Sequence, residues 1–281
     1  MLDSLIQTIE NALAQQAENP TVSIENAHLA FEKFLSLLES GQVRAAYPDE
    51  NNVWHCNPLV KQLILYGFKL GRLTESIEHD YQFCDKHNLW PNMQKLAERS
   101  IRIVPGGSTV RRGACIKNGV TMMPPAYVNI GGFVDEGSMV DSHVTIGSCA
   151  QIGKHCHISA ATQIGGVLEP VGALSVIVED NCFVGGNCGI YESAHIHAGA
   201  VIASGTIITR STPVFDLVKN EIIRAVDGVI HIPENAVVVS GARTIKTDFA
   251  HQYGLSAYAP LIIKYRDDKT ETSIALEKLL H

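Results

Sequence analysis

The chain has 281 residues, of which 46% are hydrophobic, 18% charged and only 6% aromatic. The hydrophobic content excludes a disordered or fibrous chain, and the formal net charge of −7 argues against nucleic acid or an anionic membrane as the main partner. Because aromatic residues are scarce, small and branched aliphatic side chains have to fill the core, which favours an architecture that repeats one narrow cross-section.

The sequence contains no apolar run of about 18 residues and no basic-then-apolar leader. We therefore expect a soluble, cytoplasmic protein without a membrane partner. The seven cysteines include no C-x-x-C pair, and their odd number argues against a disulfide framework. We expect reduced thiols that mainly serve packing.

Helical periodicity dominates the first hundred residues. Apolar residues recur at three- and four-residue spacings in three segments, which is typical of one face of a helix. The third segment opens with Asn57 and Pro58, suited to the N-cap and first position of a helix. We therefore expect residues 1–100 to form a helical domain, in which no catalytic cluster is found. The apolar stripes are Leu2, Leu5, Ile6, Ile9 and Leu13; Leu29, Phe31, Phe34, Leu35 and Leu38; and Leu59, Leu63, Ile64 and Phe68.

From residue 104 the apolar period is six. An aliphatic residue returns at every sixth position, and the residue two positions before it is small or β-branched. Strand side chains alternate with a period of two, so both residues point to the same side, and Gly, Asn or Ser takes the corner. The register slips by two residues within 165–177 and then resumes. The aliphatic positions are Val110, Ile116, Met122, Val128, Val134, Val140, Ile146, Ile152, Ile158 and Ile164, followed by Val178, Val184, Ile190, Ile196, Ile202 and Ile208.

An internal repeat of this regularity overrides local predictions. Three hexads complete one triangular coil, so we expect a parallel β-helix with stacked aliphatic ladders inside. The repeat resembles the hexapeptide repeat of left-handed β-helix proteins, and the left hand is implied by that resemblance. The resemblance also implies an acyltransferase that uses CoA or acyl carrier protein, and a homotrimer with active sites between neighbouring prisms.

The β-helix is expected over residues 101–241, with a hairpin insertion near 211–228. After this insertion, Ile232 and Val238 return to the six-residue register. The strands of the hairpin are Val214–Leu217 and Glu221–Arg224.

The remaining residues, 242–281, are expected to form a small cap. Its elements are a last strand, Ala259–Tyr265, and a short helix, Thr270–Leu280.

Longer strings within the coils are more specific than the repeat itself. They are Tyr127–Gly131, Val134–Gly137, Met139–Asp141, Gly147–Lys154, Ile164–Pro170, Glu179–Phe183 and Val237–Gly241. Together they resemble the tetrahydrodipicolinate N-succinyltransferase family of bacterial lysine and diaminopimelate biosynthesis. The resemblance covers roughly residues 100–265, with a weaker echo at Gly41–Arg44 and Trp54.

The family reaction transfers succinyl from succinyl-CoA to the amino nitrogen of a dicarboxylate formed by ring opening. Such a transfer needs a base, donors for the thioester oxyanion and cations for the carboxylates. Asp141 matches the family's acidic residue at the substrate and lies one position after an inward valine, so we expect it to point outward as the catalytic base. Arg102 matches the family's substrate-contacting arginine, and Arg111 and Arg112 are further candidates for the second carboxylate. A solvated or corner-binding aspartate and an end-cap arginine are the alternative interpretations.

For CoA, the resemblance points to the later coils. Ala203, Ser204 and Gly205 offer small side chains and accessible backbone N–H groups beside the pantetheine arm. Lys246 aligns with a family lysine that could meet a phosphate group, although a solvated lysine explains it equally well. We expect an acyl-CoA cosubstrate, with succinyl-CoA as the first candidate.

The sequence departs from the family where its chemistry is expected. Gly189 stands in the place of a family glutamate, and the nearest acid, Glu192, is expected at a corner. His143 replaces a family tryptophan and is a second candidate base. A kept scaffold with an altered pocket is typical of a paralogue. The alternative function is therefore transfer from acetyl-CoA to the same or a related amino-dicarboxylate, as in tabtoxin-type secondary metabolism.

Two other classes stay open at this point. A non-catalytic solenoid is favoured by the missing glutamate. Zinc-dependent anhydrases with a left-handed β-helix use three histidines, and this chain has 12. His195 and His197 flank inward Ile196 and share an outward face. However, among His155, His157, His195 and His197, no two are separated by 18 residues, the length of one coil. Because zinc needs three or four convergent ligands, we expect no bound metal.

Overall fold

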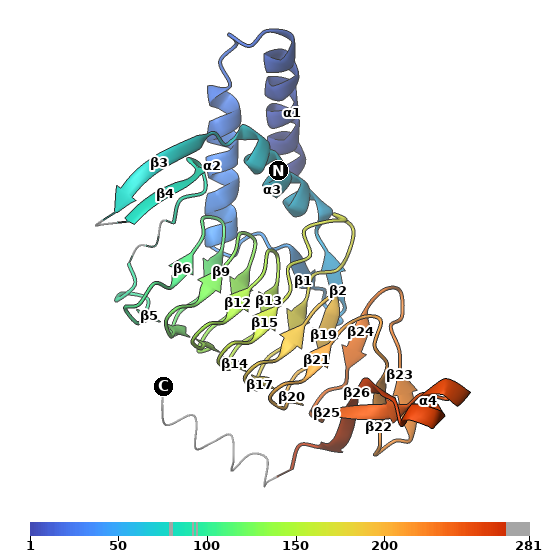
Figure 1. Ribbon diagram of the computed structural model, residues 1–281. Coiled ribbons are helices and arrows are strands. Elements are labelled where there is room, and N and C mark those ends of the chain that lie inside the picture. Colours follow the sequence, from blue (N-terminus) through green and yellow to red (C-terminus); the bar gives the residue numbers. More distant parts are fainter. Residues whose placement is uncertain (79–80, 92, 94, 268–281) are drawn as a thin grey trace.

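The computed structural model describes residues 1–78, 81–91, 93 and 95–267, and shows a helical part set against a long prism of stacked coils (Figure 1). The three predicted helices are confirmed. They are α1 (Leu2–Glu18), α2 (Glu25–Glu39) and α3 (Pro58–Leu70).

The helices share one core, in which Ile9 and Phe34 are fully buried. Leu29 was predicted to belong to the buried stripe of α2, and this was wrong. Its side chain is 61% exposed, because Ala27 and Phe31 occupy the inner face of the helix instead.

Two antiparallel hairpins accompany the helices, and neither was predicted. Their strands are short and several of their apolar side chains are exposed, among them Leu73 and Ile77, so no alternating pattern marks them. The first hairpin pairs β1 (Ala46–Pro48) with β2 (Trp54–Cys56), and the second pairs β3 (Leu73–Glu78) with β4 (Tyr81–Lys86).

The prism is a parallel β-helix, as predicted, and its short strands stack into three sheets. We number the sheets by the order in which they begin. Sheet 1 contains the coil strands β5 (Arg102–Ile103), β8 (Thr121–Met122), β11 (Met139–Val140), β14 (His157–Ile158), β17 (Phe183–Val184) and β20 (Val201–Ile202). Sheet 2 contains β6 (Thr109–Val110), β9 (Tyr127–Val128), β12 (Thr145–Ile146), β15 (Gln163–Ile164), β18 (Gly189–Ile190) and β21 (Ile207–Ile208). Sheet 3 contains β7 (Cys115–Ile116), β10 (Phe133–Val134), β13 (Gln151–Ile152), β16 (Ile177–Val178), β19 (Ala194–Ile196) and β24 (Ile230–Ile232).

The interior of the prism confirms the six-residue ladder. Each predicted aliphatic position is at most 4% exposed, from Val110 to Ile208. The small residues two positions earlier are buried beside them from β7 onward, and their polar groups are satisfied. For example, the hydroxyl of Ser138 donates to the carbonyl of Gly153 (2.7 Å), and that of Thr162 to Gly185 (2.9 Å). The narrow cross-section explains the scarcity of aromatic residues.

The corners of the coil depend on a left-handed backbone conformation three residues before many of the inward residues. Glycine takes several of these positions, for example Gly137 with φ +67°. Residues with a Cβ atom also occur there, including His143 (φ +62°) and Ala161 (φ +60°). The prediction of Gly, Asn or Ser at corners was therefore too narrow, because the hydrogen bonds between coils also hold less suitable residues in this conformation.

The apparent slip of the register is an insertion of eight residues. Phe133 and Gln151 pair 18 residues apart, whereas Gln151 pairs with Ile177, 26 residues further on. The extra residues leave the prism between β15 and β16. Eight inserted residues equal one full period of six plus two, so in the sequence they look like a slip of two residues.

The C-terminal end of the prism carries the predicted hairpin, which consists of β22 (Val214–Asp216) and β23 (Glu221–Ile223). Ile232 pairs with Ile196 and Val238 with Ile202, so both return to the coil as predicted.

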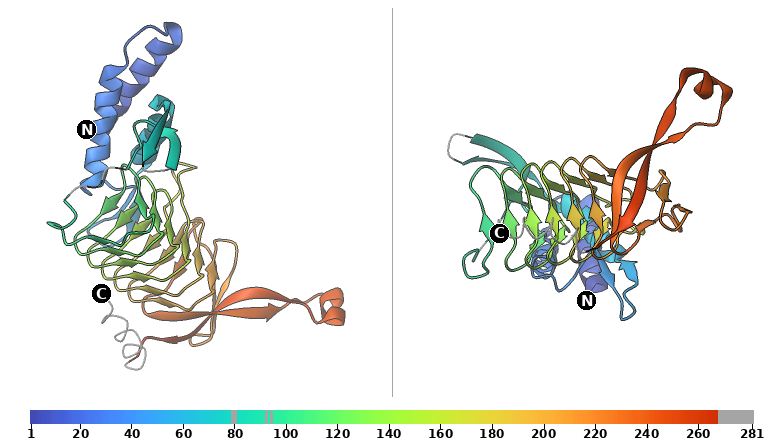
Figure 2. Two further views of the ribbon diagram at one scale, coloured as in Figure 1. Left: turned by 60° about the vertical axis from the view of Figure 1, so that its left-hand side comes forward. Right: turned by 90° about the horizontal axis from the view of Figure 1, so that it is seen from below.

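Two long strands, β25 (Ala236–Thr244) and β26 (Ser256–Tyr265), then pair as an arm that projects from the prism (Figure 2). The predicted last strand is confirmed and begins three residues earlier than expected. An unpredicted helix, α4 (Asp248–Tyr253), lies at the tip of the arm. The predicted helix Thr270–Leu280 lies outside the described residues.

All seven cysteines are free, and five of them are buried, as expected for thiols that serve packing. Of the helices in the described part of the chain, none has the length and apolar character needed to cross a bilayer.

Candidate functional site

Asp141 follows β11 on sheet 1 and its side chain is 27% exposed, as its position after an inward valine predicts. Its Oδ1 accepts a hydrogen bond from the amide of Ser142 (2.7 Å). Its Oδ2 lies 3.6 Å from Nε2 of His157. The sheet therefore presents a carboxylate beside an imidazole, a pair suited to accepting and passing on a proton.

His157 was not among the predicted site residues. It opens β14 and pairs with Met139, so it lies one coil away from the Met139–Asp141 string. Its ring packs edge-on against Phe183, with 5.3 Å between the ring centroids, and its side chain is 16% exposed. His157 could have been predicted as a neighbour of Asp141, because residues 18 positions apart lie side by side in adjacent coils.

Arg102 lies in β5 on the same sheet and is exposed. It pairs with Thr121, which in turn pairs with Met139, so β5 lies two strands away from β11, the strand that Asp141 follows. Neighbouring strands are about 4.8 Å apart, which puts the two backbones roughly 10 Å apart along the prism axis. The structure therefore brings the predicted base and one predicted cation to one face.

Small residues follow Asp141 along sheet 1. In the next three coils its position is taken by Ser159, Gly185 and Ala203, which we call the small-residue strip. The register is set by backbone bonds from each amide to the next coil, such as Asp141 N to the carbonyl of Ile158 (3.0 Å). The strip leads from the carboxylate to the residues predicted to meet CoA.

At that end, Ser204 and Gly205 are exposed, as expected. The prediction of accessible N–H groups, however, was wrong for two of the three residues. The amide of Ala203 donates to the carbonyl of Val238 (2.8 Å), and that of Gly205 to Gly186 (2.9 Å). Coil-to-coil pairing uses these donors, so the contribution of Ala203 and Gly205 is their small size.

Lys246 is exposed at the far end of the arm, between β25 and α4. Strand β25 is part of sheet 1 at Val238 and then continues outward (Figure 2). Because an extended strand rises about 3.3 Å per residue, Lys246 lies roughly 20 Å beyond the prism. The structure does not bring this lysine to the Ala203–Gly205 corner of its own chain.

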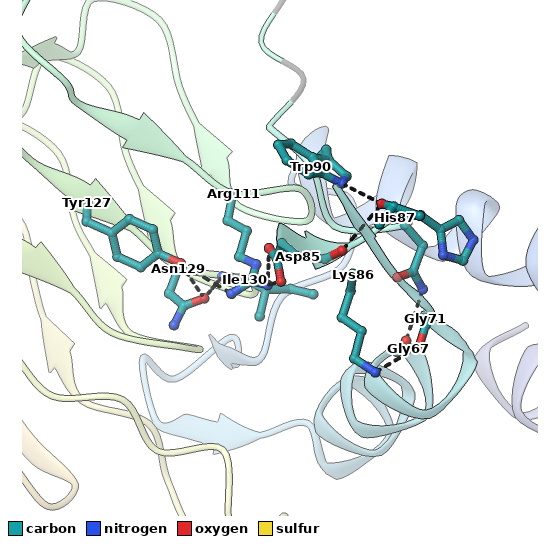
Figure 3. Close-up of polar contacts among 12 residues, drawn as sticks. Gly67, Gly71, Asp85, Lys86, His87, Trp90, Arg111, Tyr127, Asn129 and Ile130 are labelled. Carbon is teal, nitrogen blue, oxygen red and sulfur yellow. Dashed lines mark hydrogen bonds and ion pairs between the residues drawn. The ribbon is translucent and has the colours of Figure 1, made fainter. Parts of the chain in front are cut away.

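Arg111 and Arg112 face the helical part instead of Asp141. Figure 3 shows the Arg111 guanidinium at the carboxylate of Asp85, where Nη2 donates to both oxygens at 2.9 and 2.7 Å. Arg112 donates to Glu39 (2.7 Å) and Glu32 (2.9 Å) of α2. Both arginines thus connect the first coil to the helical part.

The same two arginines line a cavity of about 230 Å³ with Arg99 and Glu39 at the start of the prism. Inward residues of the first coil, including Val110, complete its lining. Its cations already have carboxylate or carbonyl partners, since Arg99 also donates to the carbonyl of Ile116. We therefore interpret this cavity as part of the junction between the helical part and the first coil, and not as a site for a substrate carboxylate.

Gly189 lies in β18 on sheet 2, a different face from Asp141. A Cβ atom at this position would lie 2.4 Å from Cε2 of Tyr191, so the tyrosine ring occupies the space that a larger residue would need. Glu192 lies at an exposed corner, as expected, with φ +54°. His143 is also at an exposed corner, two residues from Asp141.

A separate group of histidines gathers on sheet 3. His195 and His197 lie there together with His231, which was not among the predicted candidates. The hairpin insertion lengthens this coil to 36 residues, so a search at a spacing of 18 misses the pairing. The sequence did contain the information needed to place His231 beside His195. His231 directly precedes Ile232, and Ile232 was predicted to return to the six-residue register.

Two family models match separate segments of the chain. Residues 4–70 match the N-terminal domain of tetrahydrodipicolinate N-succinyltransferase, and residues 175–210 match the hexapeptide repeat of succinyl-transferase. The resemblance predicted from the sequence is thus confirmed, and its N-terminal part is stronger than the predicted echo.

Curated relatives carry the same family name. A 2,3,4,5-tetrahydropyridine-2,6-dicarboxylate N-succinyltransferase from Methylobacterium sp. (strain 4-46) is 36% identical over 133 residues, 45% of this chain and 46% of the relative. The protein of that name from Psychrobacter sp. (strain PRwf-1) is 37% identical over 135 residues, 46% of this chain and 48% of the relative. In both cases the match spans slightly less than half of the relative's length.

One solved structure supports the fold. A Campylobacter jejuni protein assigned as a 2,3,4,5-tetrahydropyridine-2-carboxylate N-succinyltransferase aligns with 86% of this chain and 63% of its own, with a TM-score of 0.52 and 16% sequence identity. Together with the repeat model, this likeness supports the predicted fold class, a left-handed parallel β-helix with N-terminal helices.

Proposed function

We propose that this relative of the tetrahydrodipicolinate N-succinyltransferases is a CoA-dependent N-acyltransferase. Its acceptor is the amino group of tetrahydrodipicolinate or of the ring-opened form, and succinyl-CoA is its donor. The observation that carries the proposal is the outward carboxylate of Asp141, with His157 beside it and Arg102 on the same sheet.

The chemistry assigns one task to each of these groups. The acceptor nitrogen attacks the thioester carbonyl carbon, a C–N bond forms, and the C–S bond to CoA breaks. Asp141 takes the proton that the nitrogen loses, and its carboxyl group can pass this proton on to the imidazole of His157, which lies 3.6 Å away. Arg102 is long enough to reach a carboxylate of a substrate whose amino group lies at Asp141, which fixes the orientation of the acceptor.

The small-residue strip is suited to a thin, extended ligand. Ser159 and Ala203 leave room beside the sheet for the pantetheine arm, whose thioester would then lie at the Asp141 end. A Cβ atom at Gly185 would lie 2.6 Å from the amide nitrogen of Ser204, so the next coil already occupies the space beside this glycine. We keep Ala203, Ser204 and Gly205 as the corner nearest to CoA.

Lys246 supports a homotrimer with sites between neighbouring prisms. It lies at the end of a projecting arm and not beside the Ala203–Gly205 corner of its own chain, so a role at a CoA phosphate requires the CoA of a neighbouring chain. The roles of Arg111 and Arg112 in the proposal are to hold the first coil and the helical part together.

Gly189 favours the second candidate, an acetyl-CoA-dependent paralogue acting on the same or a related amino-dicarboxylate. Tyr191 fills the space beside Gly189, where the family has a glutamate side chain, so this face of the prism differs in shape and charge from that of the family.

The test is an assay of thiol release by purified full-length protein with tetrahydrodipicolinate and either succinyl-CoA or acetyl-CoA. Preference for succinyl-CoA supports the proposal, preference for acetyl-CoA supports the paralogue, and no turnover with either donor overturns both. Asp141→Asn should lower kcat about 100-fold or more, the usual contribution of a general base. Arg102→Ala should raise KM for the dicarboxylate while leaving KM for acyl-CoA unchanged.

Asp135→Asn provides a matched control for Asp141→Asn. Asp135 follows inward Val134 on sheet 3 and accepts from the next amide (2.9 Å), so it reproduces the local geometry of Asp141 on another face. Its variant should keep full activity. Equal losses in both variants would show that the loss comes from the corner geometry and not from proton transfer.

A further inference from the structure

Three imidazole rings lie against one another on sheet 3. His195 and His197 lie on either side of inward Ile196 in β19, and His231 is the pairing partner of His195 in β24. The ring centroids of His195 and His197 are 3.9 Å apart, and that of His231 lies 5.2 Å and 5.4 Å from them. Each ring offers one nitrogen within 4.8 Å of the others.

Glu179 orients this cluster from the preceding coil. Its Oε1 lies 2.7 Å from Nε2 of His195 and 3.5 Å from Nδ1 of His197. The same oxygen accepts from Nε1 of Trp54 (3.0 Å), and its Oε2 accepts from the amide of Ala198 (2.9 Å). A carboxylate that accepts from one ring nitrogen fixes the proton there and leaves the other nitrogen with a free lone pair.

The surroundings favour uncharged imidazoles. His195 is 3% exposed under the indole of Trp54, with 6.1 Å between the ring centroids. Burial, together with the neighbouring histidines, lowers the pKa of His195 and His231. Neutral rings are the form in which histidine binds metals.

We propose that His195, His197 and His231 of one chain bind a single first-row divalent cation of the zinc type. Tetrahedral zinc with nitrogen bonds of about 2.05 Å holds its ligand atoms roughly 3.3 Å apart. Nε2 of His197 and Nδ1 of His231 are already 3.1 Å apart. The cluster contains no thiolate, and imidazole donors suit zinc better than magnesium or calcium.

The side of the cluster at His231 is exposed, so a water molecule can complete the coordination. Glu179 would hold His195 in place from behind, as carboxylates do for many metal-bound histidines. The site is distinct from the proposed acyl-transfer site, because it lies on sheet 3 and Asp141 on sheet 1. It would link β19 to β24 across the coil that carries the hairpin insertion, and through Glu179 it would be connected to Trp54 of the helical part.

A cavity of about 330 Å³ lies next to this site. Its lining includes Trp54, Ser193 and Val229, the last two being two residues before His195 and His231 respectively.

The experiment uses full-length, tag-free protein treated with a chelator and then titrated with Co²⁺, followed by displacement with Zn²⁺. We expect one Co²⁺ per chain, the visible absorption of four-coordinate cobalt, and loss of that absorption on addition of zinc. His231→Ala should weaken binding at least about 100-fold, and Glu179→Gln about 10- to 100-fold with unchanged stoichiometry. His251→Ala, which removes an exposed histidine of α4, should leave binding unchanged.

Thermal unfolding gives a second readout, because a cation that binds only the folded state raises Tm. Zinc should raise Tm in the wild type and in His251→Ala, but not in His231→Ala. The absence of four-coordinate absorption, equal affinity in His231→Ala, or a stoichiometry below one per chain would each overturn the proposal. None of these readouts depends on acyl transfer, so they separate this proposal from the proposed function.

Discussion

Arg111 of the first coil and Asp85 of β4 form a two-pronged ion pair, with Nη2 at 2.9 and 2.7 Å from the two carboxylate oxygens. The arginine side chain is 18% exposed and also lies over Phe68 of α3, at 5.7 Å from the ring centroid. This contact joins two parts of the molecule that fold by different rules, one with helical periodicity and one with a period of six.

If this pair serves the junction, Asp85→Asn and Arg111→Ala should each lower the free energy of unfolding by about 1 kcal/mol, since the carboxylate is partly exposed and the pair is screened. The double variant should be no less stable than Arg111→Ala, because both changes remove the same interaction. Urea unfolding measures these values, and Glu75→Gln on the same hairpin is the control. A raised KM for the dicarboxylate in Arg111→Ala but not in Asp85→Asn would instead place Arg111 at the substrate.

Gly189 and Tyr191 form a packed pair on sheet 2, and this pair predicts a stability effect. Gly189→Ala should lower the free energy of unfolding by about 1–3 kcal/mol, because the new methyl group would lie 2.4 Å from the tyrosine ring. In a Tyr191→Ala background the same change should cost less, because the remaining close contact, at 2.9 Å, is with Cδ1 at the flexible end of Ile207. Gly172→Ala is the control, since a Cβ atom there meets nothing within 4 Å. Equal effects of Gly189→Ala in the two backgrounds would contradict the steric explanation.

Asp216 predicts how stability depends on pH. Burial raises the pKa of Asp216. Hydrogen bonds from the Tyr265 hydroxyl (2.6 Å) and from the amides of Lys219 and Val218 lower it by more than burial raises it, so the pKa in the folded protein is below the ordinary value of 3.8. A carboxyl group with a depressed pKa stabilises the fold above its unfolded pKa, and this contribution is lost as the pH falls through the folded pKa.

We therefore expect Asp216→Asn and Tyr265→Phe to lower the free energy of unfolding at neutral pH. The difference from the wild type should shrink below about pH 4. Denaturant unfolding at a series of pH values measures this. A difference that stays constant with pH would mean that the charge of Asp216 contributes nothing.

Ala161 tests the corners of the coil. Its φ of +60° is unfavourable for a residue with a Cβ atom by about 1–2 kcal/mol, whereas glycine adopts it freely. Ala161→Gly should therefore raise Tm or leave it unchanged. Ala160→Gly, at a neighbouring position without a positive φ, should lower it. The opposite order would show that the corner is held by side-chain packing at Ala161.

The prism could be predicted from the sequence because its rule is local. Every sixth residue from Val110 onward has to fill the same narrow space, so composition and period report the same structure. The outward direction of Asp141 was predicted by the same rule, because it lies one position after an inward valine. Its role as candidate base came from the resemblance to the family.

The rest depends on contacts between segments far apart in sequence. The partners of Arg111 and Arg112 come from β4 and α2, where no pattern marks a carboxylate as the partner of a particular arginine. His231 was missed because an insertion changes the length of a coil without changing its geometry. Lys246 was predicted to meet CoA because it resembles a family lysine, but its distance from the prism is set by the length and direction of the arm.

Both ends of the prism are covered by segments that do not follow its repeat. Met93 and Leu96 pack against the ladder at the start, and Ile223 and Ile262 at the end. An open row of parallel strands would invite the strands of another molecule to add to it and grow into a fibre. The covered ends disfavour such growth, so the way in which the coil stops protects the chain from end-to-end stacking.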